Sequence, residues 1–491
     1  MSELKSATVE TGAVAASLST SDDHVAGHTI VDDETYVDPL LEKRAMRKFD
    51  WYMLPQFAIL PFISFLDRYN IGNARVFGLE QSLGFTGNDF GDVNTIFFAS
   101  YVLFQIPWVM SIKRWGAKTV IPISFISWSL VTLGTGFVQN YAQMMAMRIL
   151  LGIFESGLFP GLTFLISTIW SRETQAKRVA VLYVAGAASG AFGGLIAYGI
   201  QLMGDQRGLE AWRWLFIVEG CISIVLCAGS WFTLPKDAET AYFLTPEEKV
   251  MMANRKRRDI VFKGDDKFDW KYARMAFKDV HIYLAAFCSF CSSIPLFGMG
   301  TFMPTIIRGL GYTSIQANYL TIPVYAFGTI CLVSAAYTSD RIKQRGLFAF
   351  FGPLSIGIGY AIFIGSTNTG AGYFALFLVA GGIYVNSTLL YTWVANNLKP
   401  DYKRSVGIPL FACLSNVSGT ISSQIYPPSD GPRYIMGNSI SLGMVFASMV
   451  GIAGIYLLLR RRNLKKQRLI DQGAMTNGHE DDKALDFKYI L

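Results

Sequence analysis

Long apolar stretches alternate with short polar segments along most of the chain. Because a helix rises about 1.5 Å per residue, roughly 20 apolar residues cover the ~30 Å hydrocarbon core of a bilayer. The pattern predicts twelve membrane-spanning helices, at residues 51–75, 91–112, 119–138, 141–167, 179–202, 213–234, 280–303, 316–338, 347–366, 372–395, 405–426 and 437–459. An even number of spans leaves both ends of the chain on the same side of the membrane.

The composition excludes the common soluble classes. Of 491 residues, 52% are hydrophobic and 16% are charged, and the mean hydropathy is +0.33; a soluble domain has about 25% charged residues. The six Cys all lie inside apolar stretches, so we interpret them as buried small side chains rather than as disulfides or metal ligands. The sequence offers no Ser/His/Asp set, metal-ligand cluster or nucleotide motif, so we expect neither an enzyme nor a cofactor.

The basic residues are distributed unequally between the two sides of the predicted membrane. Of the 43 Lys and Arg residues, 36 lie in the two tails and in the loops on the side of the tails. Six lie on the other side, and Arg148 lies within a span. Since cytoplasmic loops carry the excess of Lys and Arg, both termini are predicted to be cytoplasmic. The net charge of +7 is then a property of the membrane edges, and no nucleic-acid partner is expected.

A long polar connector separates the sixth span from the seventh. Within it, Thr245 followed by Pro246 and Glu248 is typical of a capped helix start. The basic run at 460–468 is expected to stop the last helix at the inner headgroups. The predicted organisation is a disordered cytoplasmic tail (1–42), an N-terminal six-helix bundle (43–234), a cytoplasmic connector (235–279), a C-terminal six-helix bundle (280–459) and a basic cytoplasmic tail (460–491).

Two short matches indicate that the halves are repeats. The segment LGFT at 83–86 precedes the second span, and LGYT at 310–313 precedes the eighth. At the same separation, Lys113 and Arg114 follow the second span while Asp340 and Arg341 follow the eighth, so we assign the later pair a gating or structural role. Such repeats are typical of alternating-access transporters, with a binding site near the midplane between the halves. Chance is the alternative, because the matches are short.

The first span carries an unusual charged pair. Its apolar part ends at Leu66, which is too short to cross the hydrocarbon core, so the helix is expected to continue through Asp67 and Arg68. Charges inside a membrane are costly and mark functional sites unless they face a partner or a wet cavity. The alternative is that the helix ends at Leu66 and that the pair is a solvated cap.

The fourth span contains Arg148 and Glu155, which lie two helical turns apart on one face, about 10 Å along the axis. Gly152 lies between them and would allow another backbone or a substrate to approach. For Arg148 we favour a structural ion pair with neighbouring helices. For Glu155 we favour proton exchange, because a carboxyl in a low-dielectric cavity prefers its neutral form.

The charges of Asp67, Arg68, Arg148 and Glu155 sum to zero. If one carboxyl takes a proton, the group becomes positive and attracts an organic anion, with Arg68 placed for two-pronged contact with a carboxylate. Asp67 and Glu155 are therefore the candidate proton-coupling residues, and coupling of proton and anion follows from charge balance.

The second half offers neutral polar groups instead of charges. By the repeat, Pro295 corresponds to Arg68 and Gly382 to Glu155. We expect the neutral groups to contact the rest of the substrate, although hydrogen bonding between helices is the alternative for each. They are Asn386, Ser387, Thr388, Tyr391, Thr392, Trp393, Asn396, Asn397, Asn416 and Ser418.

Several stretches together resemble the major facilitator superfamily, in its anion:cation symporter group near the fungal allantoate, nicotinate and pantothenate permeases. They are LDRYNIGNAR (66–75), RILLGIFESGLFPG (148–161), Trp170 with Glu173 and Arg178, WRWLFIVEG (212–220), FLTPEEK (243–249), PTIIRGLGY (304–312), KRSVGIPL (403–410) and SDGPRYIMG (429–437).

The resemblance implies proton-coupled uptake of small organic anions. It places Arg68 on the substrate carboxylate, Asp67 and Glu155 in protonation, and Asn416 on the substrate. The Tyr that the group often has two residues before the first-helix acid is Phe65 here, which would change substrate preference.

The sequence therefore predicts an all-α membrane protein: twelve helices in two pseudo-symmetric bundles with the major facilitator fold. The expected function is proton-coupled uptake of a small organic anion by alternating access, in a monomer in the plasma membrane, with the proton as coupling ion. The expected substrate-binding residues are Arg68, Tyr391, Trp393, Asn396 and Asn416. Export of a metabolite or drug, and a non-transporting sensor, are the competing functions. Nicotinate, pantothenate, allantoate and sulfur-containing amino acids or dipeptides all remain open as substrates.

Overall fold

The computed structural model describes residues 37–170, 172–263, 270–342, 345–399, 401–473, 482–485 and 487–490. Over these residues the fold is helical, and the one β-type pairing is an isolated bridge between Gln206 and Leu209. The predicted tail at 1–42 falls almost wholly on residues 1–36, which lie outside the described part.

The first half of the chain forms eight helices, followed by two in the connector. They are α1 (Pro39–Val76), α2 (Leu79–Ser82), α3 (Asp89–Trp115), α4 (Ala117–Thr135), α5 (Tyr141–Glu155), α6 (Leu158–Ile169), α7 (Arg172–Met203) and α8 (Ala211–Thr233), then α9 (Pro246–Lys263) and α10 (Trp270–Phe277).

The second half forms seven α-helices and a short 3₁₀ turn. They are α11 (Val280–Gly309), α12 (Ser314–Ile342), α13 (Arg345–Gly365), α14 (Thr369–Asn396), α15 (Asp401–Asn416), α16 (Ser418–Ser422), η2 (Pro428–Asp430) and α17 (Ile435–Asp471).

Each predicted span coincides with an apolar helical segment. Within the described ranges, eleven segments are long and apolar enough to cross a membrane, and Val406–Ser422 is a shorter apolar helix in the place of the eleventh span. The chain is therefore a multi-pass membrane protein. Two spans are interrupted: the fourth between α5 and α6, and the eleventh at Val417 between α15 and α16. The eleventh also ends at Ser422 rather than at 426.

Two other expectations about helix ends can be judged. The first helix does continue past Leu66, to Val76, so the alternative of a solvated cap at Asp67 and Arg68 is wrong. The basic run at 460–468 does not end the last helix, because α17 continues through it to Asp471. Lys and Arg are good helix formers, so the change from apolar to basic residues changes the surroundings that suit the helix but does not end it.

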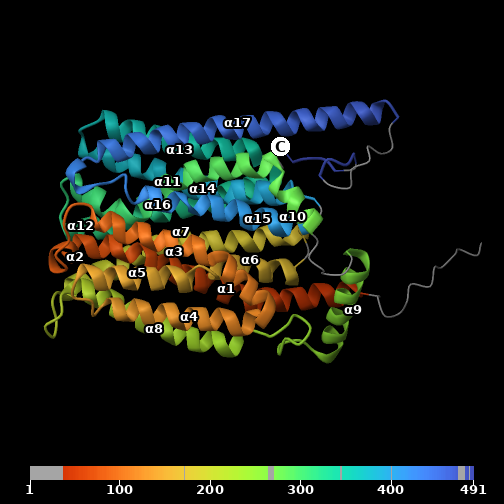
Figure 1. Ribbon diagram of the computed structural model, residues 1–491, viewed down its shortest axis with the longest axis horizontal. Helices are drawn as coiled ribbons and strands as arrows, with labels where there is room; N and C mark the ends of the chain where they lie inside the picture. Colours follow the sequence, from red (N-terminus) through yellow and green to blue (C-terminus); the bar gives the residue numbers. More distant parts are fainter. Residues whose placement is uncertain are drawn as a thin grey trace, which may run out of the picture.

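The helices pack as two groups, α1 to α8 and α11 to α17 (Figure 1). In the view of Figure 1 the first group, red to yellow-green, lies below the second, green to blue. The groups meet where α7 contacts α12, α1 contacts α11, and α3 contacts α15 and α16. The start of α1 and the end of α17 lie at the same end of the molecule, which we call the terminal side; the opposite end is the far side.

The two Leu-Gly-aromatic-Thr segments occupy equivalent turns. Each follows a helix and precedes the next span, before α3 in the first half and before α12 in the second. Gly84 and Gly311 have φ values of +67° and +99°, which side chains with a Cβ rarely adopt. The shared turn supports a repeat rather than a chance match.

The connector docks on the terminal side of the first half. As predicted, α9 begins at Pro246, and the backbone N–H of Thr245 donates to Glu248 at 2.8 Å. Glu248 also accepts from Lys48 of α1 at 2.7 Å. Burial alone would raise the pKa of Glu248, but the bonds from Lys48 and Thr245 outweigh it and lower the pKa below its usual range.

The C-terminal segment at 482–490 packs against the terminal side of the second half. Lys403 of α15 is buried between Asp279 and Asp482, with its Nζ 2.5 Å from each carboxylate. Burial opposes both charges, but their attraction raises the pKa of Lys403 and lowers that of Asp279. Further along, Asn397, which directly follows α14, exchanges two hydrogen bonds with the backbone of Ile490, at 2.8 and 3.0 Å. The predicted basic tail therefore includes a segment that ties α14, α15 and α17 together.

Candidate functional site

A small central cavity lies between the two groups of helices. Its volume is about 10 Å³, which is roughly the space needed by one water molecule. The halves must therefore separate before a larger molecule can enter. Its walls are aromatic, with two guanidinium groups and two neutral polar groups: Phe65, Arg68, Tyr69, Asn94, Phe97, Phe98, Arg148, Phe297 and Thr301.

Arg68 forms the central ion pair of this cavity. Its Nε lies 2.6 Å from Oε1 of Glu155, which is the last residue of α5. The Arg68 side chain is 11% exposed and that of Glu155 is fully buried. The sequence placed both residues inside the membrane, and the structure brings them into direct contact.

The Glu155 carboxylate is bound asymmetrically. Ser64 and Arg68 lie one turn apart on the same face of α1, and both donate to Oε1. The other oxygen, Oε2, is buried without a hydrogen-bond partner in the described structure. An open oxygen on a fully buried carboxylate is a natural acceptor for a proton, since protonation removes the cost of burying the charge.

Three aromatic rings surround the Arg68 guanidinium. Its central carbon lies 5.1 Å from the ring centre of Phe65, 5.6 Å from that of Phe97 and 4.5 Å from that of Tyr101. Such distances allow cation–π attraction. Aromatic rings this close to the guanidinium also favour a flat partner that can stack among them.

Arg148 lines the same cavity, and the structural role expected for it stays a prediction. Its Nε and Nη2 are buried without hydrogen-bond partners, and it makes no ion pair among the residues that the structure describes. Gly152, between Arg148 and Glu155, meets α3: a Cβ at this position would collide with the backbone oxygen of Phe97 at 2.5 Å. The glycine therefore admits another backbone, which was one of the two possibilities.

Asp67 precedes the ion-paired Arg68 by one residue on α1, so it is offset from Arg68 by about 100° around the helix axis. It is 1% exposed, and neither carboxylate oxygen has a hydrogen-bond partner in the described part of the chain. Trp128 and Thr132 of α4 are its neutral neighbours, and Glu155 and Arg148 are its charged ones.

A third buried acid, Glu219 of α8, was missed as a candidate. It is 1% exposed and accepts a hydrogen bond from the side chain of Asn70 on α1. The signal was available, because Glu219 lies within the apolar stretch 213–234 and the rule that selected Glu155 selects it too. With Glu219 included, the ionised cluster no longer sums to zero but carries one net negative charge.

The expected substrate-binding residues of the second half lie at different places. Asn416 reaches across to Gln105 of α3 at 3.5 Å, so it lies between the halves. The Tyr391 ring contacts Tyr183 of α7, with ring centres 5.8 Å apart.

Trp393 and Asn396 are not close to Arg68. The Trp393 indole N–H donates to the backbone oxygen of Ile490 at 2.8 Å, and Asn396 is the last residue of α14. Both therefore belong to the terminal side. The sequence could not place them, because all positions along an apolar helix carry the same hydropathy signal.

Two aromatic residues of the second half contact Tyr69, which lines the cavity, and they gave no sequence signal. The Tyr69 hydroxyl lies 3.4 Å from that of Tyr384 on α14, and its ring stacks on Tyr325 of α12 at 5.8 Å. Phe and Tyr are common in apolar helices, so their positions alone do not mark a site.

The pair Asp340 and Arg341 ends α12 on the terminal side. Arg341 is exposed, and the side chain of Asp340 lies outside the described part of the structure. The gating role expected for the pair stays a prediction.

Polar contacts join the two halves on the far side. Gln424, which follows α16, binds Asn88 at 2.5 Å and Asp92 at 2.8 Å, both at the start of α3. Gln201 near the end of α7 accepts from Asn318 of α12 at 3.2 Å. These contacts hold the two halves together on the far side.

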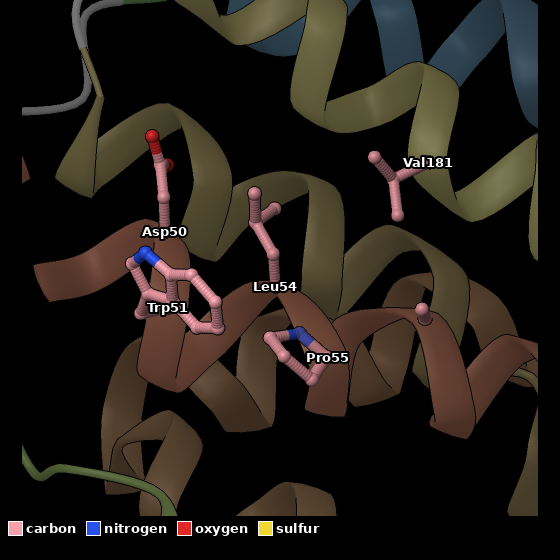
Figure 2. Close-up of a pocket in the computed structure, with 6 residues that line it drawn as sticks. Asp50, Trp51, Leu54, Pro55 and Val181 are labelled. Atoms are coloured by element: carbon pink, nitrogen blue, oxygen red, sulfur yellow. The ribbon is translucent and has the colours of Figure 1, made fainter. Parts of the chain in front are cut away.

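A second recess lies between α1 and α7 on the terminal side. Figure 2 shows Trp51, Leu54 and Pro55 on one wall and Val181 opposite. Its one acid, Asp50, is already held by Arg178 at 2.6 Å and by the Trp170 indole at 2.9 Å. With no free polar group to orient a ligand, this apolar recess is a weaker candidate than the central cavity.

Comparison with known proteins places the fold in context. The family profile described as Major Facilitator Superfamily matches residues 57–423. An uncharacterized transporter of Schizosaccharomyces pombe is 38% identical over 466 residues, covering 94% of this chain and 95% of that protein. The high-affinity nicotinic acid transporter of Saccharomyces cerevisiae is 36% identical over 471 residues, covering 94% and 88% respectively.

Solved structures share the fold at low identity. A D-xylose-proton symporter superposes with a TM-score of 0.66 at 14% identity, over 82% of this chain and 97% of that one. A bacterial homologue of the human lysosomal transporter Spinster, in an inward-facing conformation, gives a TM-score of 0.63 at 14% identity, over 86% and 97%.

Proposed function

The chain belongs to the Major Facilitator Superfamily, whose members here are transporters rather than enzymes, and from this premise we propose that it couples the uptake of a small aromatic carboxylate to a proton. Nicotinate is the first candidate substrate. The observation that carries the proposal is the 2.6 Å ion pair between Glu155 and Arg68, which lines the small central cavity.

The ion pair supports an exchange of anions on one guanidinium. An incoming carboxylate has the same charge and shape as the Glu155 side chain, so it can replace Glu155 on Arg68. The displaced Glu155 would then be a buried carboxylate that has lost its ion-pair partner, and a proton on its open Oε2 neutralises it. Binding the anion therefore requires binding a proton, and neither is carried alone.

The surrounding rings support a flat substrate. Phe65, Phe97 and Tyr101 lie within 6 Å of the Arg68 guanidinium carbon, at 5.1, 5.6 and 4.5 Å. An aromatic ring attached to the bound carboxylate could stack among them, while an aliphatic chain would gain less. The nicotinic acid transporter of Saccharomyces cerevisiae, 36% identical, handles a molecule of this class.

The polar contacts on the far side and the small cavity support transport by alternating access. Separating Gln424 from Asn88 and Asp92 would open the far side, and separating the terminal ends of the two groups would release the substrate. We propose that the terminal side is cytoplasmic, that the protein acts in the plasma membrane, and that Asn416 and Tyr391 contact the part of the substrate away from the carboxylate.

Uptake assays test the proposal. Permease-deficient cells expressing the protein are given radiolabelled nicotinate, pantothenate and allantoate at about pH 5 and about pH 7.5. Nicotinate uptake should be faster at the lower pH, and Glu155→Gln should remove that difference while Arg68→Ala abolishes uptake. Uptake that ignores pH in the wild type would overturn proton coupling. Loss of preloaded label in place of uptake would favour an exporter.

A further inference from the structure

Glu219 lies outside the exchange described above, and within the described part of the chain it is buried without an ion-pair partner. Its side chain accepts one hydrogen bond, from Asn70 to Oε2, while Oε1 has no partner in the described residues. Asp67 is the charged neighbour that acts on it. An ionised Glu219 would therefore be a buried anion facing a second acid, which is the most costly arrangement available to it.

Asp67 differs from Glu219 in its neighbours. It lies one turn before Asn70 on the same face of α1, so it shares the α1–α8 contact with Glu219. From α5 it faces both Glu155 and the cation Arg148, and from α4 it faces the neutral donors Trp128 and Thr132. Asp67 thus has a cation to balance a negative charge, and Glu219 has none.

The two buried arginines and three buried acids discussed above can be arranged so that no charge is left without a partner. Arg68 balances Glu155 through their ion pair. Arg148, which has two unpartnered nitrogens, balances Asp67. Glu219 is then neutral only if it keeps a proton.

We infer that Glu219 is a carboxylic acid that holds one proton throughout the transport cycle, and that it positions Asp67 and Asn70 without exchanging protons with either side. This inference rests on the proposed function for the meaning of the cycle. A protonated Glu219 would offer an O–H donor to the buried oxygens of Asp67 and Asn70, which have no hydrogen-bond partner in the described residues. The transported proton is that of Glu155.

The position of Glu219 agrees with a proton that stays in place. Glu155 is paired with Arg68, which lines the central cavity, whereas the hydrogen-bond partner of Glu219 in the described structure is Asn70, which does not line it. Glu219 is held between α1 and α8 within the first half, away from the surface where the halves separate.

Infrared spectroscopy of the purified protein tests the inference without any substrate. At about pH 7.5, wild-type protein should show the C=O stretch of a protonated carboxylic acid, and this band should be absent in Glu219→Gln. Glu219→Asp retains a carboxylic acid and should shift the band rather than lose it. This variant replaces Glu219→Gln in the test if the Gln variant does not fold. Glu210→Gln, a half-exposed acid preceding the same helix, should lose carboxylate absorption only. If Glu219→Gln instead loses absorption of an ionised carboxylate and keeps the carboxylic acid band, Glu219 is ionised in the wild type and the inference is overturned.

Transport supplies the second readout. Gln resembles a protonated, neutral Glu in shape and charge. The ratio of uptake at acid pH to uptake at neutral pH in Glu219→Gln should therefore stay within about twofold of the wild-type ratio. In Glu155→Gln the difference between the two pH values should disappear. A Glu219→Gln variant that folds but no longer responds to pH would show that Glu219 exchanges the transported proton. If no variant, including wild type, transports the tested anions, the proposed substrate is wrong while the infrared result still judges Glu219.

Discussion

Replacing Arg68 with Lys tests whether the shape of the guanidinium, and not only its charge, binds the substrate. Lys keeps the positive charge but offers a single ammonium group in place of a planar fork. In the structure one N–H of Arg68 is bound to Glu155 at 2.6 Å, and the flat group lies among three rings. Lys therefore loses one charge-assisted hydrogen bond to the incoming carboxylate together with the stacked geometry.

The expected size of the effect follows from that lost bond. A hydrogen bond to a charged group contributes about 1.5 to 3 kcal/mol, and each 1.4 kcal/mol is about a tenfold change in affinity. The KM for nicotinate should rise about 10- to 150-fold, in an uptake assay on cells or on protein in liposomes. Arg75→Lys is the matched control.

Arg75 is suited to that comparison because it is also a buried arginine of α1 among aromatic rings. It pairs with Glu80 at 2.9 Å, and its guanidinium carbon lies 4.3 Å from the Phe90 ring centre. It does not line the central cavity, so Arg75→Lys should leave the KM within about threefold of the wild type. Equal KM values for wild type and Arg68→Lys would refute the assigned contact between Arg68 and the carboxylate.

Three further changes test the packing around the site. Lys403→Met leaves two buried carboxylates without their cation and should lower the free energy of unfolding by about 3 to 5 kcal/mol. The measurement is the melting temperature of the purified protein in detergent, which should fall. A melting curve equal to that of the wild type would contradict the buried ion pair. Because the pKa of Glu248 is lowered in the folded protein, its contribution to docking α9 is complete above about pH 4.3 and is lost as the pH falls further. Limited proteolysis of the connector should therefore increase below that pH, and Glu248→Gln should show the increase already at neutral pH. Gly194→Val places a Cβ within 2.8 Å of a backbone oxygen of α12 and should hold the two halves apart on the far side. A cysteine introduced into the cavity should then react with an impermeant thiol reagent faster than the same cysteine in a protein that keeps Gly194. An unchanged rate would mean that the helices adapt to the larger side chain.

The sequence was sufficient for the fold because the membrane imposes one strong signal. Every apolar stretch of sufficient length became a helix, and the shortness of the apolar part before Asp67 correctly predicted that α1 continues to Val76. It did not predict the interruption at Val417, since Ser, Gly and Val there keep the hydropathy of a continuous span. Nor did it predict that α17 extends to Asp471, because hydropathy describes the solvent around a helix and not its end.

The sequence predicted the site residues that are charged, and it missed or misplaced those whose position depends on tertiary packing. Arg68, Arg148 and Glu155 gather near one cavity, as their position inside apolar spans suggested. Trp393 was misplaced because its indole binds the C-terminal segment, a tertiary contact that local sequence does not encode. The Phe65 and Tyr101 rings around Arg68 carry no charge and so look like any other residue of an apolar helix.

The central claim is that an anion and a proton bind together because the anion displaces Glu155 from Arg68. Purified protein in lightly buffered solution, mixed with nicotinate in the presence of a pH indicator, tests it directly. The account predicts that the medium becomes more alkaline by about one proton for each anion bound, and that Glu155→Gln binds nicotinate without any change of pH. Binding by the wild type with no proton uptake would contradict the account.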